Sequence, residues 1–580
     1  MSGMLKKNWH IWILAAIMLV AFFVRIWNLN DMLCFKMDQA RDAAIIQNTF
    51  EQGPGYLPLL GPRSAGTFLR LGPVFYYFQY ISTQITQSIE PVVLVYPDIL
   101  FSVLAIPLFF VFLSQFFTRG TSVILSGLFG LSFIAVQYGR FAWNPNQTVF
   151  WSILFLLCVY KTAIFKNRRK AGWWLIGAAA SYGVLSQLHF TALLIFPIVT
   201  LLFWMFYRPS RIKLAFWIGA FAVLTVFYIP MMLSETITGF DNMNQFKYAL
   251  THKSKELPLS EKINQSLKLH GKYYSLFLTS YGNTENRCFV YTFYAMILFA
   301  LWRGHRLWKE TQSKEKRAFL VLIACWFFVF SLLYTKLAFT VLKTRFWLLI
   351  IAIPYIILGL FFEWIYRVGH KKRGYIIAGI ITMFLFVGNT HAIGYWYWAI
   401  INQREATEHP RNLVLKQSNL VSIKQMADAV DFIADRSNEA GKQVCYNTEG
   451  EYKSPYMYLF KLHYPLMPVK RVTFAKDTNE ACVFFSIENG GVGEEPELPN
   501  SYKKYFYSIQ KKQFGVVTVW EIWKDEEGVN KYVELRKQQK ALKKINESKE
   551  ENLKEDNEDK KPRRKERVFW KDVLSGDYEE

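Results

Sequence analysis

The pattern of apolar and polar positions divides most of the chain into blocks that are long enough to cross a lipid bilayer. Each block holds about 20 mainly apolar residues, the length that a transmembrane helix needs. Short polar or basic loops separate the blocks. Eleven blocks are predicted to span a membrane, at about residues 11–27, 92–116, 121–138, 147–165, 172–188, 190–207, 213–234, 288–303, 318–335, 345–365 and 374–394.

One further apolar segment, residues 71–88, is interpreted as a juxtamembrane helix. It opens with Gly72-Pro73 and contains Gln79 and Gln84. Counting it as a span would place the basic cluster at 166–170 outside the cytoplasm, whereas basic loops favour the cytoplasmic side. The N-terminus is therefore predicted to be cytoplasmic, in a multi-pass protein of the plasma (inner) membrane.

This topology places two long loops, residues 28–91 and 235–287, and everything after about residue 395 outside the cytoplasm. The transmembrane domain is expected to cover residues 1–399. An α/β domain is expected at 400–526, because a segment of helical apolar spacing is followed there by short strand-like runs.

The charged tail, residues 527–580, is of low complexity, and we expect it to be disordered or loosely helical, without chemistry of its own. The expected fold class is a polytopic α-helical membrane protein of about 11 transmembrane helices. It carries a small extracytoplasmic α/β C-terminal domain and a charged tail.

Composition and charge agree with a membrane protein. Of 580 residues, 52% are hydrophobic and 17% aromatic, which excludes a soluble enzyme, a fibre and a disordered chain. The net charge of +23 lies largely in short loops, as expected for positive-inside topology and attraction to anionic lipid. Because the basic residues form no separate domain, no nucleic-acid partner is expected.

The cysteines leave one question open. Six cysteines in this length exclude a disulfide-dense scaffold and have no metal-type spacing. Cys445 and Cys482 both lie on predicted strands in a domain expected outside the cytoplasm. A disulfide and two buried free thiols are both compatible with the sequence.

The first long loop contains the strongest candidate for chemistry. Asp38 lies at or near the N-cap of a predicted helix that begins at about Met37. Asp42 follows four residues later and shares its face, and Arg41 neighbours both carboxylates. Taken alone, this pattern is typical of an ordinary capping residue with a local ion pair.

The order of the motifs that follow carries a resemblance. After the predicted helix come Gly53-Pro54-Gly55, Gly61-Pro62-Arg63, a second Gly-Pro turn at 72–73 and the aromatic run Phe75-Tyr76-Tyr77. In this order the chain resembles the GT-C superfamily of membrane glycosyltransferases, of the family 39 type. That type includes protein O-mannosyltransferases and the lipid A aminoarabinose transferase. The resemblance covers about residues 9–235, and the later spans by topology only.

The resemblance implies particular site residues. Family members have a catalytic acid in the first outer loop, a place that Asp38 occupies in this sequence. Many of them have Asp-Glu there, whereas this chain has Asp38-Gln39. Asp38 is then the single base, and Asp42 is the candidate for a second acid or metal ligand. A later stretch with Arg140 and Asn144 resembles another outer loop, in which the family often has an arginine followed by an acid.

The resemblance also implies a reaction. The family transfers a sugar from a polyprenyl-phosphate carrier to an acceptor hydroxyl outside the cytoplasm. A hydroxyl needs a base to accept its proton, and one-step displacement at the anomeric carbon inverts its configuration. Cations stabilise the departing phosphate. The candidates are the basic residues of the predicted outer loops, Arg70, Arg140, Lys343 and Arg345.

Other residues are candidates for the sugar or acceptor site. His189 lies in a short turn between two spans, and its alternative role is hydrogen-bonded packing. The other candidates are Trp143, Asn144, Tyr76 and Tyr77. For the aromatic ones the alternative is an interfacial belt. No tightly bound cofactor is expected, and a loosely held divalent cation at the phosphate, with Asp38 or Asp42 as ligand, stays open.

The expected partners are the lipid bilayer, a polyprenyl-phosphate-linked sugar and an acceptor that is a protein, a lipid or a cell-wall glycan.

The main alternative function is that of a transporter or flippase of a lipid-linked substrate. Transporters carry charges within spans, whereas here polar residues gather in the loops. A non-catalytic scaffold would tolerate loss of Asp38. Within the glycosyltransferase interpretation, the runner-up is an oligosaccharyltransferase or a glycan polymerase, and the lack of a WWD-type run in the expected C-terminal domain counts against the oligosaccharyltransferase.

Overall fold

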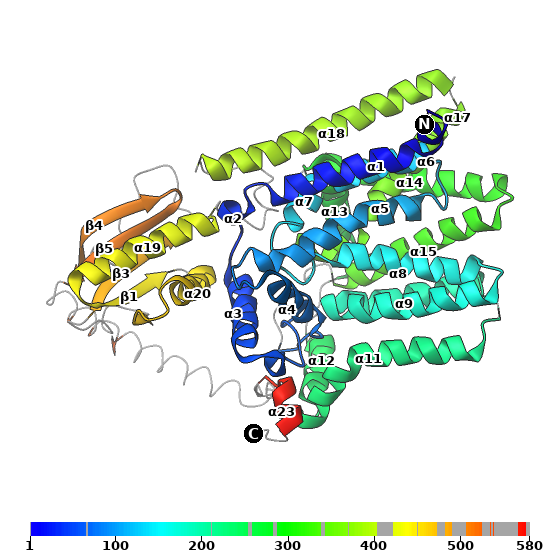
Figure 1. The fold of residues 1–580 in the computed structure, drawn as a ribbon. Helices are drawn as coiled ribbons and strands as arrows, with labels where there is room; N and C mark the ends of the chain where they lie inside the picture. Colours follow the sequence, from blue (N-terminus) through cyan, green and yellow to red (C-terminus); the bar gives the residue numbers. More distant parts are fainter. Residues whose placement is uncertain are drawn as a thin grey trace.

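The computed structural model describes most of the chain. The described residues are 2–64, 68–209, 211–252, 258–281, 287–337, 343–368, 371–402, 421–448, 450–472, 482–489, 506–524 and 567–575, with the single residues 530, 534, 537 and 538. A bundle of roughly aligned helices forms the larger part, and a small sheet with two helices lies beyond one end of it (Figure 1).

Every predicted apolar block is helical, alone or as a broken pair, so the expected polytopic helical fold is confirmed. The blocks become α1 (Ser2–Ile26), α5 (Tyr96–Leu113), α6 (Arg119–Gly130) with α7 (Phe133–Tyr138), α8 (Thr148–Ile164), α9 (Arg168–Leu188), α10 (Phe190–Phe206), α11 (Leu214–Thr238), α14 (Arg287–Glu310), α15 (Lys314–Lys336), α16 (Thr344–Trp347) with α17 (Ala352–Val368), and α18 (Lys371–Ile401).

Length and apolar composition identify the clearest membrane spans. Within the described residues, α1, α5, α11, α15 and α18 each contain a stretch long and apolar enough to cross a bilayer. The segment from Thr344 to Val368 is a sixth if its two parts, bent by 45°, are one span. Helices α8 and α10 are apolar but shorter. The chain is therefore a multi-pass membrane protein, and the count of eleven spans stays a prediction.

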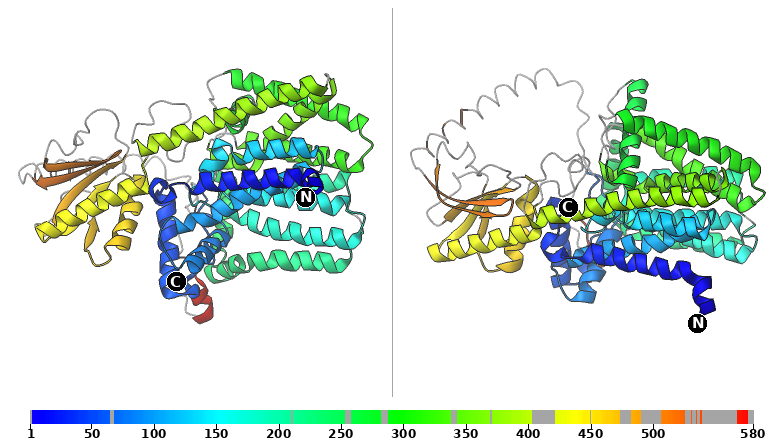
Figure 2. Two further views of the ribbon diagram at one scale, coloured as in Figure 1. Left: turned by 45° about the horizontal axis from the view of Figure 1, so that its top comes forward. Right: turned by 90° about the horizontal axis from the view of Figure 1, so that it is seen from above.

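One end of the bundle carries the first long loop and the C-terminal domain, and we call it the domain end (Figures 1 and 2). Helices α2 (Leu29–Met32), α3 (Met37–Gln52) and α4 (Val74–Thr86) lie there. Helix α3 runs across the direction of the bundle helices (Figure 1). Helix α4 has 13 residues, which is about 20 Å and too short to span, in agreement with a juxtamembrane helix.

The Gly-Pro turns of the first loop bring two backbone segments into close contact. Gly61 donates its N–H to the carbonyl of Leu71 at 2.8 Å. A Cβ on Gly61 would lie 2.0 Å from the carbonyl oxygen of Gly72, and one on Gly72 would meet the side chain of Gln187 at 2.2 Å. Both positions therefore require glycine.

The second predicted outer loop is largely helical. It contains α12 (Asp241–His252) and α13 (Leu259–Thr279). Helix α13 buries one face, including Leu269, Tyr273 and Phe277, and packs against α14 and α15. This segment is thus part of the bundle core rather than an open loop.

The C-terminal domain has the expected α/β character. Its sheet has the order β2-β1-β3-β5-β4. Strand β1 is parallel to β2 and β3, and β5 is antiparallel to β3 and β4. The elements are α19 (Ile423–Ala440), β1 (Gln443–Thr448), α20 (Lys453–His463), β2 (Val469–Arg471), β3 (Cys482–Asn489), β4 (Phe506–Phe514) and β5 (Val517–Lys524).

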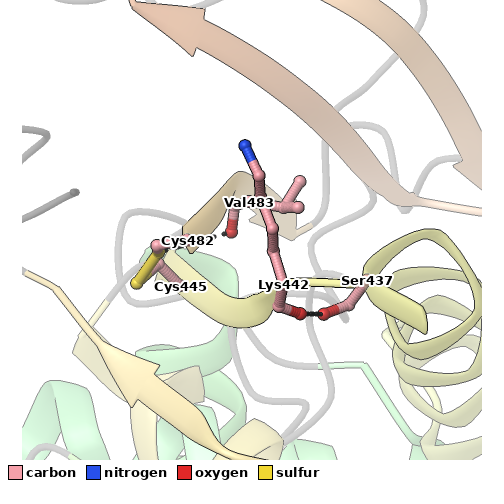
Figure 3. Close-up of a disulfide and its surroundings, with 5 residues drawn as sticks. All are labelled: Ser437, Lys442, Cys445, Cys482 and Val483. Carbon is pink, nitrogen blue, oxygen red and sulfur yellow. Dashed lines mark hydrogen bonds between the residues drawn. A yellow bond between two sulfur atoms is a disulfide. The ribbon is translucent and has the colours of Figure 1, made fainter. Parts of the chain in front are cut away.

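A disulfide joins two neighbouring strands of this sheet. Cys445 on β1 is bonded to Cys482 on β3, with 5.8 Å between their Cα atoms (Figure 3). Of the two alternatives that the sequence left open, the structure therefore has the disulfide.

Two buried arginines attach the end of α1 to the rest of the bundle. The Nε of Arg25 donates to Ser102 Oγ at 2.9 Å. Arg140 donates to the carbonyls of Val24 at 3.0 Å and Trp27 at 2.9 Å, and its guanidinium lies 4.7 Å from the ring centre of Tyr397. The last carbonyls of a helix lack partners within it, so Arg140 satisfies them.

We expect Arg140→Met to lower the free energy of unfolding by about 3 kcal/mol, because it leaves several buried carbonyls without donors. Thermal unfolding of the detergent-solubilised protein measures the change. Arg119→Met, at an exposed arginine, is the control and should unfold at the wild-type temperature. Equal unfolding temperatures for the two variants would contradict this role for Arg140.

We expect replacement of both cysteines, Cys445→Ser with Cys482→Ser, to destabilise the C-terminal domain by about 3 kcal/mol, since the bond closes a loop over a separation of 37 residues. Limited proteolysis should then cleave the domain sooner than in wild type while the helical bundle stays intact. The same variant tested in reducing buffer should differ little from reduced wild type.

Candidate active site

The first turn of α3 is fixed by a glutamine that contacts two parts of the chain. The backbone N–H of Lys36 donates to Gln39 Oε1 at 3.2 Å. The Gln39 amide donates in turn to the carbonyl of Ala142 at 3.1 Å. Asp38 lies in this same turn, where the helix dipole favours a negative charge. Gln39 therefore connects the turn that carries Asp38 to the loop between α7 and α8.

One guanidinium bridges the two aspartates of α3. Arg41 Nη1 lies 3.1 Å from Asp38 Oδ1, and Arg41 Nη2 lies 2.8 Å from Asp42 Oδ1. The side chain of Asp38 is 30% exposed, whereas that of Asp42 is 1% exposed. A substrate can therefore reach Asp38 but not Asp42.

Asp42 acts as a buried anchor in this arrangement. Tyr76 donates its hydroxyl to Asp42 Oδ1 at 2.8 Å. Burial raises the pKa of Asp42, and the charge of Arg41 opposes the rise. Burial and the charge of Asp42 also raise the pKa of Tyr76, which keeps its hydroxyl a donor. Among the described residues, no group of three or more His, Cys, Asp or Glu side chains is placed to hold a metal ion.

Arg345 lies on the short helix α16 and approaches Asp38 from another part of the chain. Its guanidinium lies 5.2 Å from the ring centre of Trp143, and it is close enough to Asp38 for their charges to interact. Within the described part of the chain, the guanidinium makes no hydrogen bond and no ion pair. Its donors are therefore available to a ligand.

Buried aromatic rings fix the backbone beneath Arg345. Trp347 stacks on Tyr273 of α13 at 4.8 Å and contacts Phe330 of α15 at 5.5 Å. Tyr334 donates its hydroxyl to the carbonyl of Phe346. Arg345 thus projects from a short helix whose next two residues are held by the bundle core.

The turn between α9 and α10 reaches the same region. His189 Nδ1 accepts from the N–H of Thr191 at 3.3 Å, so the histidine caps α10 and carries its proton on Nε2. Its ring contacts Phe346 edge-on at 5.3 Å. Burial and the charge of Arg345 lower the pKa of His189 to about 3, so it is neutral near pH 7. Asn144 donates to the carbonyl of Leu188 at 2.6 Å.

Two of the four predicted phosphate ligands are engaged with other parts of the chain. Arg140 is 3% exposed, and its guanidinium donates to carbonyls at the end of α1, so these donors are not available to a phosphate. Arg70 exchanges two hydrogen bonds with Asn242 through its backbone and lines a separate small pocket with Arg63. Lys343 is exposed and immediately precedes α16, so it lies beside Arg345.

The two tyrosines of α4 do not line an open sugar site. Tyr76 is fully buried and bonded to Asp42. Tyr77 donates to the carbonyl of Pro58 at 3.3 Å and accepts from the indole of Trp570 at 2.9 Å. Trp143, the third predicted aromatic residue, packs against Arg345 near Asp38.

The structure adds residues that the sequence analysis did not select. Lys36, next to α3, pairs with Glu451 of the C-terminal domain at 2.9 Å. Phe35 contacts Tyr458 of α20 at 5.5 Å. Asp98 is buried in the first turn of α5 beside the side chain of Gln147. A carboxylate at the start of an apolar block was a visible signal for Asp98, whereas a contact across 415 residues leaves no local signal.

We expect Gln39→Glu to destabilise the protein by about 2 kcal/mol, although the two side chains have the same shape. The carboxylate would face the Ala142 carbonyl without a proton to donate, in a position 2% exposed. Thermal unfolding measures the effect. Gln52→Glu, at an exposed position of the same helix, is the matched control, and a wild-type unfolding temperature for Gln39→Glu would contradict the contact.

Comparison with solved structures finds the same architecture. ArnT from Cupriavidus metallidurans bound to undecaprenyl phosphate matches with a TM-score of 0.53 and 12% identity, over 88% of this chain and 98% of that one. The same protein in the apo state matches with a TM-score of 0.51 and 11% identity, over 89% of this chain and 98% of that one. A third match is AglB from Archaeoglobus fulgidus, an oligosaccharyltransferase in complex with an inhibitory peptide and a dolichol-phosphate. Its TM-score is 0.49 and its identity 13%, over 90% of this chain and 75% of that one. Comparisons with protein-family models and with curated proteins give no match. The chain has the fold of the GT-C superfamily of membrane glycosyltransferases.

Proposed function

We propose that the protein is a membrane glycosyltransferase that moves a sugar from a polyprenyl-phosphate donor to an acceptor hydroxyl, with Asp38 as general base. One observation carries the proposal. A carboxylate that substrate can reach lies near an arginine whose guanidinium makes no hydrogen bond or ion pair with the described residues, at the domain end of a GT-C fold.

Asp38 has the geometry of a base. Arg41 donates to its Oδ1, and no described residue donates to its Oδ2, so Oδ2 is available to an acceptor hydroxyl. The acceptor oxygen attacks the anomeric carbon while Asp38 Oδ2 takes its proton. A single displacement of this kind inverts the anomeric configuration.

Arg345 is positioned to bind the leaving group, which is the lipid phosphate. The bond between the anomeric carbon and the phosphate oxygen breaks as the new bond forms, and negative charge develops on the lipid phosphate. A guanidinium can bind two phosphate oxygens at once, and its stacking on Trp143 limits its orientation before the donor arrives. Lys343 adds a second positive charge two residues earlier.

The lipid-linked donor and the side of the membrane have separate support. The ArnT structure of the same fold contains undecaprenyl phosphate. The disulfide of the C-terminal domain belongs to an oxidising compartment, which agrees with an extracytoplasmic domain end. Contacts such as Lys36 with Glu451 place this domain next to α3, where it can take part in choosing the acceptor.

We expect Asp38→Asn to lower the release of polyprenyl phosphate at least about a hundredfold, the usual contribution of a general base. Membranes with matched expression would receive a panel of polyprenyl-phosphate sugars with native lipid and protein acceptors, and mass spectrometry would follow the released carrier. Arg345→Met should also lose release. Glu51→Gln, at an exposed carboxylate of the same helix, should keep it.

Two other outcomes of this experiment would count against the proposal. Equal release by Asp38→Asn and wild type would remove Asp38 as the base. Consumption of the donor by neither protein, with transbilayer movement of the lipid-linked sugar in both, would replace the proposal by the flippase alternative.

A further inference from the structure

The C-terminal end of the chain returns to the first long loop. The N–H of Leu59 donates to the carbonyl of Val568 at 3.0 Å, and the N–H of Trp570 donates to the carbonyl of Leu57 at 3.1 Å. Pro58 and Phe569 form an antiparallel bridge between these bonds. The short helix α23 (Trp570–Ser575) follows, and Figure 1 shows it beside α12, at the domain end. The sequence predicts a tail that is disordered or loosely helical, whereas its described residues 567–575 are docked on the first long loop.

Side chains reinforce this backbone pairing. Trp570 donates its indole N–H to Tyr77 Oη at 2.9 Å. Lys571 lies 4.4 Å from the ring centre of Tyr56, and Phe569 packs on that ring at 6.4 Å. Val568 is 3% exposed. These contacts are specific to the aromatic sequence Phe569-Trp570, which differs from the Lys/Glu-rich residues before it.

Arg567 brings the docked segment to the aspartate cluster. Its guanidinium lies 5.5 Å from the ring centre of Tyr76, and Tyr76 donates to Asp42. A cation over a phenol ring withdraws electron density from it, which opposes the rise in the pKa of Tyr76 and strengthens the hydroxyl as a donor. Asp42 in turn binds Arg41, which binds Asp38.

We propose that the docked residues Arg567–Lys571 support the active site from outside and that Arg567 is a positioning residue. Arg567 holds Tyr76 against Asp42, Asp42 orients Arg41, and Arg41 orients the carboxylate of Asp38. The proposal rests on the proposed function, since it assigns the base to Asp38. Its structural half, the docking of the segment and the coupling of Arg567 to Tyr76, can be tested without a donor.

Docking is tested by a cysteine pair in the full chain. Pro58→Cys with Phe569→Cys should form a disulfide, because the two residues face each other across an antiparallel bridge. With a protease site inserted after Asn552, the cleaved tail should stay attached on a non-reducing gel. Each single variant controls for pairing with native cysteines, and Pro58→Cys with Leu574→Cys, at a 79% exposed residue, should link poorly. Release of the tail from the first pair would overturn the docking.

Positioning is tested by kinetics. Arg567→Ala should lower kcat about tenfold, with the KM for the donor unchanged, and Arg567→Lys should recover most of the loss because it restores the cation. Leu574→Ala, on the exposed face of the same segment, should behave as wild type. Combining Arg567→Ala with Tyr76→Phe should lower kcat no further than Tyr76→Phe alone. A wild-type kcat for Arg567→Ala, or fully additive losses, would overturn the positioning role.

The same double-mutant cycle can be measured by thermal unfolding, which needs no donor. Non-additive unfolding temperatures for Arg567→Ala and Tyr76→Phe would support the coupling even if none of the supplied donors is consumed. In that case the proposed function is rejected, whereas the coupling of the docked segment to Tyr76 is retained. Additive temperatures together with a released tail would reject the inference whatever the reaction is.

Discussion

The candidate site depends on one guanidinium shared by two carboxylates of unequal exposure. A buried charge is costly unless it is paired. Asp42 pairs with Arg41 and Tyr76 through Oδ1, while its Oδ2 is buried without a hydrogen-bond partner. Arg41 is thereby fixed, and its remaining donor meets Asp38 at the surface of the same helix. One turn of helix therefore supplies both an anchor and a presented carboxylate.

The bundle brings the other half of the site to that turn. The loop after α7, the turn before α10 and the short helix α16 meet around Trp143, His189 and Arg345. Each is held by contacts that do not involve ligand. Gln39 of α3 donates a hydrogen bond to the loop after α7. Trp347 of α16 packs on Tyr273 in the bundle core. In the proposed reaction, the groups assigned to the donor phosphate and the acceptor are thus positioned before substrate binds, which is how an enzyme obtains electrostatic stabilisation without reorganisation.

Segments far apart in sequence converge on the first loop. Glu451 of the C-terminal domain forms an ion pair with Lys36. Arg567, in the last described segment, lies over the ring of Tyr76. Lys36 lies two residues before Asp38, and Tyr76 on α4 is hydrogen-bonded to Asp42. Changes in the C-terminal domain or the tail therefore have a short physical path to Asp38, which is consistent with a role for these regions in acceptor choice or in positioning.

The sequence by itself determined the class of fold, because apolar length is a local property that a bilayer imposes on each span. It also predicted that Asp38 lies close to Arg41 and Asp42, because these follow it by three and four residues on one helix. The ion pair between Arg41 and the adjacent, buried Asp42 was shown only by the structure. The tertiary structure decided which arginine faces Asp38. Arg140 and Arg345 are equivalent by type and predicted location, but only the packing of α1 and α16 shows that the first satisfies helix carbonyls and the second does not. The disulfide, the burial of Tyr76 and the docking of the tail were likewise decided by tertiary contacts, since pairing across tens to hundreds of residues has no periodicity that a sequence can display.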